Sequence, residues 1–313
     1  MILINIKSVG IMNIKKWLQI NTESLKGKRV AVTGSTGGIG RELCSYLGLL
    51  GASLVLLDRN FERSQAHKQS LCERFRDIEV TCIELNLEKH DSAENAVKRL
   101  KELEIDVFIH NAGAYSIPRR KCESGYDNVF QINFATPYYM INELLPILRK
   151  RKGRVVAVGS IAHNYSKTDP CDIDFSSRKA SSKVYGNAKR YLMFSLYELF
   201  KNEKEASLAI THPGITFTNI TAHYPKLIFA VIKHPMKIIF MKPKKASLSV
   251  LKGVFEATEY CRWIGPSIFD VWGMPKSKKL KTCNEDERNK IFHTANNVYM
   301  QCKKTINNKG EQL

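Results

Sequence analysis

The stretch Arg29-Val-Ala-Val-Thr-Gly-Ser-Thr-Gly-Gly-Ile-Gly40 decides the fold. It is a short apolar run that ends in glycines, and a helical stretch, Arg41–Leu50, follows it. Gly34 permits a sharp turn, Gly38 lets the backbone approach a pyrophosphate, and Gly40 allows the helix to pack closely on the strand. The free N–H groups and the dipole at the start of a helix favour phosphates. We therefore predict a dinucleotide site, the alternative being a glycine-rich turn without a ligand.

Strand-like and helix-like segments alternate through the rest of the chain. Further strands are predicted at Ser53–Leu57, Glu79–Leu85, Ile105–His110, Arg154–Val158, Ser207–Thr211 and Ser267–Val271. Strands rich in Val, Ile and Leu between helices are typical of a parallel sheet covered on both faces. Because no repeat, linker or composition break interrupts the pattern, we expect one doubly wound α/β domain at residues 27–275. Residues 1–26 form an N-terminal extension, and residues 276–313 a basic, frayed tail.

The composition excludes several classes of protein. Of the 313 residues, 43% are apolar and 25% are charged, which rules out disorder and fibrous repeats. The formal charge of +19 attracts anions such as nucleotides and acidic lipids, but no recognised nucleic-acid module places stacking aromatics among the lysines. The eight scattered cysteines include no C-x-x-C pair, so we expect no metal site, no disulfide scaffold and a cytoplasmic location. The N-terminal residues do not have the pattern of a secretory signal.

Asp58 ends the second predicted strand, 18 residues after Gly40. An acid about 20 residues beyond the glycines meets the adenosine ribose hydroxyls in dinucleotide folds; the alternative is a solvated turn residue. A carboxylate there repels a 2′-phosphate, whereas Arg59 attracts one. On balance the sequence favours NAD(H) over NADP(H). Asn111-Ala-Gly113 follows the fourth strand and adds a small-residue loop at the same edge of the sheet.

Tyr185 and Lys189 are the first catalytic candidates. They are four residues apart in Tyr185-Gly-Asn-Ala-Lys189, on one face of a predicted helix. A free phenol titrates at about 10, and a fixed ammonium beside it favours the phenolate and lowers the pKa of the tyrosine. Tyr197 and Lys201 repeat the spacing, but Tyr197 lies about 120° around the helix and about three turns deeper. We expect Tyr197 to be a packing residue.

Ser160 and Asn133 complete the catalytic candidates. Ser160 follows the strand Arg154–Val158, so its hydroxyl projects at the carboxyl edge and could orient a substrate carbonyl; a helix cap is the alternative. Asn133 is predicted in a helix that faces the same cleft, where its backbone groups could hold a water for proton relay.

These motifs together resemble the short-chain dehydrogenase/reductase family over about residues 27–220. The resemblance rests on Thr33–Gly40, Asn111-Ala-Gly113, Asn133, Ser160, Tyr185–Lys189 and His212-Pro-Gly-Ile-Thr-Phe-Thr218. It implies a Rossmann-like sheet of about seven strands, a nicotinamide cofactor, and hydride transfer to or from a carbonyl carbon. The family tetrad falls on Asn133, Ser160, Tyr185 and Lys189. The implied cofactor contacts are Gly34, Ser35, Thr36, Gly38, Ile39, Gly40, Asp58, Arg59, Asn86, Leu87, Asn111, Ala112, Gly113, Tyr185, Lys189, Pro213, Gly214, Thr216 and Thr218, with Thr218 on the nicotinamide carboxamide.

Within the family, the long interval between Ser160 and Tyr185 is similar to the retinol-dehydrogenase-like and WW-domain-oxidoreductase-like branch. Two positions depart from the family pattern. Asn86 stands where an Asp is usual beside the adenine, and His110 stands where Asn is frequent before Asn111-Ala-Gly113. The resemblance also suggests a homodimer or homotetramer.

The region 224–258 is expected to cover the substrate pocket. Leu227–Met241 is rich in Ile, Phe and Met, which favours an apolar substrate such as a lipid, retinoid or steroid alcohol or ketone. Tyr224–Lys245 also holds six lysines and no acid, so peripheral contact with an anionic membrane is the alternative role. Its two apolar blocks, Leu227–Ile232 and Ile238–Met241, are both shorter than the roughly 18 to 20 residues of a membrane span. For the whole chain, the alternative function is a non-catalytic dinucleotide sensor or scaffold.

Overall fold

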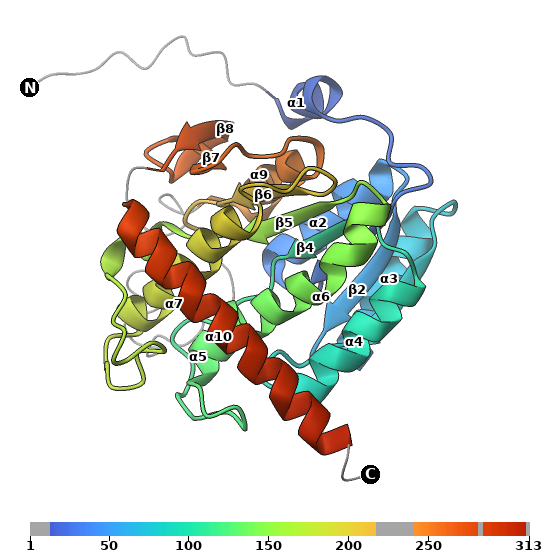
Figure 1. The fold of residues 1–313 in the computed structure, drawn as a ribbon. Helices are drawn as coiled ribbons and strands as arrows, with labels where there is room; N and C mark the ends of the chain where they lie inside the picture. Colours follow the sequence, from blue (N-terminus) through green and yellow to red (C-terminus); the bar gives the residue numbers. More distant parts are fainter. Residues whose placement is uncertain (1–12, 217–240, 281–283, 311–313) are drawn as a thin grey trace, which may run out of the picture.

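The sheet has eight strands in the order β3-β2-β1-β4-β5-β6-β7-β8 (Figure 1). The structure is a computed structural model that describes residues 13–216, 241–280 and 284–310, with side chains of the last segment described to residue 304. The strands are β1 (Arg29–Thr33), β2 (Ser53–Asp58), β3 (Val80–Glu84), β4 (Val107–His110), β5 (Arg154–Val158), β6 (Ser207–Thr211), β7 (Arg262–Ile268) and β8 (Trp272–Lys279). All neighbouring pairs are parallel except β7 with β8.

Helices cover both faces of the sheet and divide the core in two. One layer of buried side chains joins the sheet to α1 (Ile14–Asn21), α2 (Gly38–Leu49), α3 (Phe61–Arg74) and α9 (Pro243–Phe255). The other joins it to α4 (His90–Glu102), α6 (Thr136–Lys150), α7 (Ser181–Leu199) and α10 (Glu285–Gly310). The short elements α5 (Asn128–Phe130), η1 (Gln131–Ala135) and η2 (Ile161–Tyr165) lie between them in sequence. The doubly wound α/β architecture predicted from the sequence is confirmed.

Burial on both faces explains why the inner strands are almost continuously apolar. Val30, Ala31 and Val32 of β1 are fully buried, as are Val155 and Val156 of β5. Since the strands are parallel, their carboxyl ends meet at one edge, and the polar residues at these ends are brought together there.

The sheet differs from the predicted seven strands at its far edge. Of the predicted strand Ser267–Val271, Ser267 and Ile268 end β7 and the rest forms the turn of a hairpin, because β7 begins at Arg262 and β8 returns antiparallel to it. β8 contains Pro275 and alternate lysines, which suit an exposed edge strand but do not give an apolar strand pattern.

The prediction of a frayed tail after Pro275 is wrong. After β8, helix α10 runs across the outside of α7, α6 and α4 (Figure 1). Ile291, Ala295, Val298 and Cys302 are at most 1% exposed and join the core. Their spacing of three to four residues places them on one face of a helix.

Part of the N-terminal extension also packs on the domain. Asn13 caps α1, accepting a hydrogen bond from the Lys15 N–H at 3.1 Å, and Trp17 of α1 is buried in the core. The described part of the expected lid, residues 241–258, mainly forms α9, which packs on the sheet beside α2. The rest of the lid and of the proposed membrane segment lies outside the described residues. Among the described helices, none is long and apolar enough to cross a membrane.

Candidate active site

The glycine turn lies between β1 and α2 and leaves the start of α2 open. Gly34 has a φ of +68°, and an added Cβ at Gly40 would lie 2.2 Å from the Gly34 carbonyl oxygen. Only glycine therefore fits at Gly40 without a shift of the backbone. Gly37 caps α2 without a side-chain hydrogen bond, so the first N–H groups of the helix are available to an anion.

The loop after β4 packs directly against the glycine turn. The Asn111 amide donates to the carbonyl oxygens of Thr33 and Gly34 at 3.0 and 3.1 Å. The Thr33 hydroxyl accepts from the backbone N–H groups of Asn111 and Ala112, both at 3.0 Å. An added Cβ at Gly34 would lie 3.0 Å from the Ala112 Cα. The two loops thus form one rigid surface at the carboxyl edge of the sheet.

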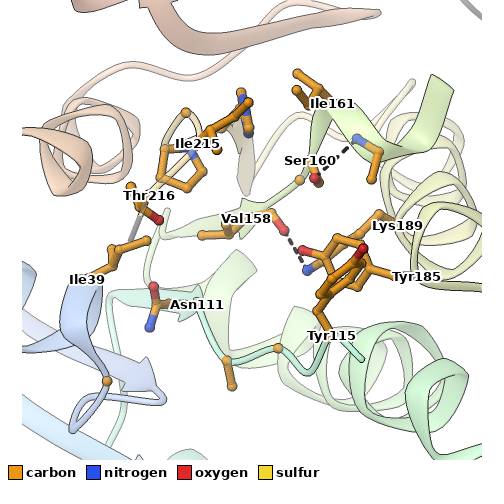
Figure 2. A pocket seen from close by; sticks show the side chains of 18 of the residues that line it. Ile39, Asn111, Tyr115, Val158, Ser160, Ile161, Tyr185, Lys189, Ile215 and Thr216 are labelled. Carbon is orange, nitrogen blue, oxygen red and sulfur yellow. Dashed lines mark hydrogen bonds between the residues drawn. The ribbon is translucent and has the colours of Figure 1, made fainter. Parts of the chain in front are cut away.

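Two cavities flank this surface. The first, of about 460 Å³, is lined by Gly34, Gly37, Gly38, Ile39, Gly40, Asn111, Ala112, Gly113, Tyr115, Val158, Gly159, Ser160, Ile161, Ala162, Tyr165, Tyr185, Lys189, His212, Pro213, Gly214, Ile215 and Thr216 (Figure 2). The second, of about 360 Å³, lies on the side of β2 and is lined among others by Thr36, Asp58, Arg59, Asn60, Arg63, Asn86 and Leu87. Both include Gly34, Gly37, Ala112, Gly113 and Tyr115. Together the two cavities form a space that extends across the glycine turn and is long enough for an elongated ligand.

Tyr185 and Lys189 meet at the first cavity, as their spacing predicts. The Lys189 Nζ lies 5.7 Å from the centre of the Tyr185 ring and donates to the Val158 carbonyl oxygen at 2.8 Å. Burial lowers the pKa of Lys189 to about 7. Burial raises the pKa of Tyr185 to about 12, opposed by a hydrogen bond with Ser160. The sequence predicts a lowered tyrosine pKa, but in the structure burial outweighs the other influences on the phenol.

Ser160 joins this pair from the loop after β5. It caps η2, where its hydroxyl accepts from the Ala162 N–H at 3.2 Å. The predicted helix cap and the predicted position beside the tyrosine therefore both hold. Tyr197, which has the same spacing from Lys201, is 2% exposed. Its hydroxyl donates to the Arg262 carbonyl oxygen, away from the cavity, as expected of a packing residue.

Asn133 holds the wall of the site through its side chain. It lies in η1, a π-helical turn, and its amide donates to the carbonyl oxygens of Ala114 and Val129, both at 2.8 Å. Its Oδ1 accepts from the Ala114 N–H at 3.3 Å. The sequence predicts a role for the backbone of Asn133; the structure adds an anchor for the loop that follows Gly113.

Asp58 faces the glycine turn. Its Oδ1 accepts from the N–H and the hydroxyl of Thr36, at 3.0 and 2.9 Å. Its Oδ2 accepts from the hydroxyls of Ser35 and Ser64, at 2.5 and 3.1 Å. A carboxylate has about four acceptor positions, so these four bonds occupy it. The glycine turn and α3 therefore already use this carboxylate, and its contact with ribose hydroxyls stays a prediction.

The remaining predicted cofactor residues fall on the cavity walls or outside the described chain. Asn86 accepts from the Glu88 N–H at 3.0 Å through its side chain, and Leu87 is 7% exposed. Pro213, Gly214 and Thr216 line the first cavity, whereas Thr218 lies outside the described residues.

Two features of the site are missed by the sequence reasoning. Tyr115 packs edge-on against Tyr185, with ring centres 5.3 Å apart, and its place two residues after Asn111-Ala-Gly113 was the available signal. Arg190 pairs with Glu287 of α10 at 2.7 Å and donates to the His163 carbonyl oxygen at 2.9 Å. No local pattern links Arg190 to a residue 97 positions away.

This geometry, of a glycine turn at one edge of a doubly wound sheet beside a Ser–Tyr–Lys cluster, defines a dinucleotide-dependent oxidoreductase. The family model described as short chain dehydrogenase matches residues 28–181. Human retinol dehydrogenase 13 is 27% identical over 206 residues, covering 64% of this chain and 62% of its own. The chicken WW domain-containing oxidoreductase is 28% identical over 246 residues, covering 76% and 58%.

A solved structure of an uncharacterized protein from Mycobacterium paratuberculosis has the same fold, with a TM-score of 0.70 and 20% identity over 91% of this chain and 96% of its own. The chain belongs to the short-chain dehydrogenase/reductase family, whose members are NAD(P)-dependent oxidoreductases. The resemblance to this family is confirmed, with distant relatives in the predicted branch.

Proposed function

We propose that this protein transfers a hydride between a nicotinamide dinucleotide and an apolar alcohol or carbonyl compound, with Tyr185 as the proton-transfer residue. The observation that carries the proposal is the convergence of Tyr185, Ser160 and Lys189 on the cavity that the glycine turn also lines. The fit of a dinucleotide is supported by the uncapped start of α2 and by the cavities on both sides of the turn.

Each catalytic candidate has a distinct role in the proposal. A phenol with a pKa of about 12 is protonated at neutral pH, so Tyr185 is ready to donate its proton to a carbonyl oxygen. Ser160 donates a hydrogen bond to the same oxygen and orients it. The bound nicotinamide supplies or accepts the hydride.

Lys189 and Asn133 support the proton transfer. Protonated Lys189 favours the phenolate that Tyr185 leaves behind, since an adjacent positive charge stabilises it. With a pKa of about 7, Lys189 also exchanges its own proton near neutral pH. Asn133 fixes the loop opposite these groups through its bonds to Ala114, and its backbone groups carry the predicted water relay.

For the cofactor, the site favours NADP(H) over the NAD(H) predicted from the sequence. The Asp58 carboxylate is already occupied by Ser35, Thr36 and Ser64. Arg59 and Arg63 line the same cavity and are exposed. Neither guanidinium pairs with an acid in the part of the chain that the structure describes. Two unpaired guanidinium groups suit a 2′-phosphate.

An apolar substrate is supported by the lining of the first cavity. Ile39, Val158, Ile161, Tyr165 and Ile215 contribute its apolar surface. Such a lining favours hydrocarbon-rich alcohols and ketones, because polar groups buried against it would lose their hydrogen bonds. The cytoplasmic location and the dimer or tetramer remain predictions.

Titration with NADPH and NADH, followed by a panel of apolar and polar carbonyl compounds, tests the proposal. We expect tight binding of NADPH and its oxidation with apolar carbonyls, read as loss of the absorbance of the reduced cofactor. Binding without turnover on any member of the panel would favour the sensor or scaffold instead. Absence of binding of either dinucleotide would refute the proposed function.

A further inference from the structure

The turn between β7 and β8 presents large apolar side chains to solvent. We call Ile268–Trp272 the hairpin tip. Phe269 is 85% exposed, Ile268 is 50% exposed and Trp272 is 39% exposed. Burial in the core therefore does not account for these side chains. A cluster of exposed apolar residues on one projecting turn indicates a contact surface more strongly than single exposed residues do.

The backbone conformation of the hairpin tip is unusual for a phenylalanine. Phe269 and Asp270 have φ values of +49° and +57°. A two-residue turn with both residues in the left-handed region favours Asn, Asp or Gly. Phe269 thus occupies a position that costs backbone energy and also exposes an aromatic ring to water. Residues in such strained conformations cluster at functional positions.

The hairpin tip is held firmly against the wall of the first cavity. The His212 Nε2 donates to the Asp270 carbonyl oxygen at 3.1 Å. The Val271 carbonyl oxygen lies 2.8 Å from where a Cβ would stand on Gly214. Both His212 and Gly214 line the cavity. Whatever contacts the hairpin tip is therefore next to the proposed substrate site.

The charges around the hairpin tip are basic. The acid in the turn, Asp270, is paired with Lys278 at 2.9 Å. Behind the turn, Lys276 lies on β8, and Lys242 and Lys244 lie at the start of α9, which contacts β8. All three lysines are exposed, and within the described segments none of them pairs with an acid. Met241, next to Lys242, packs on Gly214 just as Val271 does.

We propose that the hairpin tip docks on an anionic lipid bilayer, with Phe269 and Trp272 among the headgroups and the lysines against the lipid phosphates. Aromatic side chains with lysines behind them match the apolar interior and negative surface of such a membrane. This surface shares only Lys242 and Lys244 with the segment Tyr224–Lys245. Docking would bring the first cavity to the membrane and supply a lipid-soluble alcohol or ketone. That last consequence rests on the proposed function, whereas the docking itself does not.

The test is co-sedimentation of the full chain with vesicles of phosphatidylcholine alone or mixed with phosphatidylserine. We expect binding to the mixed vesicles that salt weakens. The double variant Phe269→Ser/Trp272→Ser should bind at least about tenfold more weakly, since two apolar side chains no longer leave water. The matched control is Leu49→Ser/Met300→Ser, which removes side chains that are 58% and 53% exposed elsewhere. It should bind within about twofold of the parent.

Tryptophan fluorescence reports directly on the hairpin tip. Of the three tryptophans, Trp17 and Trp263 are 2% and 3% exposed, so Trp272 is the one that meets solvent. Mixed vesicles should shift the emission to shorter wavelength, and brominated lipid should quench it. The variant Trp272→Phe should lose both effects.

Several results would overturn the proposal. They are no binding to mixed vesicles, equal binding by the tip variant and the parent, or no change in Trp272 emission. Concentration-dependent self-association of the parent that the tip variant loses would instead assign the hairpin tip to a protein contact. None of these measurements uses a dinucleotide or a substrate. A failure of docking is therefore distinguishable from a failure of the oxidoreductase, which is read with a water-soluble carbonyl and no lipid.

Discussion

Replacing Glu287 with Gln should weaken both the fold and the active site, although the residue lies on the C-terminal helix. The Glu287 carboxylate accepts two hydrogen bonds from Arg190, each at 2.7 Å. The Arg190 side chain is only 4% exposed. Its third bond, at 2.9 Å, goes to the His163 carbonyl oxygen, in the turn that Ser160 caps. Glu287 thus locks the Ser160 loop onto α7, the helix of Tyr185.

The expected magnitude follows from this geometry. Breaking a buried ion pair costs about 3–5 kcal/mol, but the Glu287 side chain is 20% exposed and Gln keeps one acceptor. We therefore expect Glu287→Gln to lower the free energy of unfolding by about 2 kcal/mol. If Ser160 loses its alignment with Tyr185, kcat should fall about tenfold, equal to about 1.4 kcal/mol in the barrier, with little change in the KM for the dinucleotide.

The assay pairs denaturant unfolding with steady-state kinetics. The control is Glu285→Gln, which makes the same change at an exposed residue two positions earlier. It should leave both quantities close to those of the parent. A loss of stability with unchanged kcat would show that the ion pair is only structural. Indistinguishable behaviour of the two variants would refute the reasoning altogether.

Three further predictions follow from the site and its buried groups. Arg59→Ala/Arg63→Ala should weaken NADPH binding by about tenfold or more while leaving NADH binding nearly unchanged; equal losses in calorimetric titration would remove the case for a 2′-phosphate site. Gly40→Ala should abolish dinucleotide binding and lower stability by about 1–3 kcal/mol, because its Cβ would meet the Gly34 carbonyl oxygen; a bound dinucleotide in this variant would contradict the tight turn. Burial lowers the pKa of His163 from 6.5 to about 4. The unfolded chain therefore takes up this proton first, and stability is lost as pH falls from about 6.5 towards 4, by up to about 1.4 kcal/mol per pH unit from this residue. His163→Asn should flatten the unfolding free energy against pH in that range, and parallel curves for parent and variant would count against it.

The parts of the fold that the sequence predicts are those with a local pattern. The apolar run before Gly34 and the spacing of Tyr185 and Lys189 depend on neighbours in sequence, and the structure places them as expected. β8 has no such pattern, and the apolar stripe of α10 is interrupted by many lysines and asparagines. The apolar stripe of α10 becomes meaningful only when α7 is known to lie beneath it.

Two details of the site depend on contacts that no motif encodes. Asp58 ends its strand where predicted and lines the second cavity, but Ser35, Thr36 and Ser64 already donate hydrogen bonds to its carboxylate. Burial raises the pKa of Tyr185, and the hydrogen bond with Ser160 lowers it. For both Asp58 and Tyr185, the sequence predicts the position of the residue. The hydrogen bonds of Asp58 and the pKa of Tyr185 can be read only from the folded structure.

The most direct test of the account compares Tyr185→Phe with Tyr197→Phe. Both remove one hydroxyl from α7, but the Tyr185 ring lines the first cavity whereas the Tyr197 hydroxyl bonds the Arg262 carbonyl oxygen. Loss of a general acid costs about 10²- to 10⁴-fold in rate. We predict that Tyr185→Phe loses turnover by this factor and keeps dinucleotide binding, while Tyr197→Phe keeps nearly the parental rate. Similar rates in the two variants would contradict the assignment of Tyr185 as the proton-transfer residue.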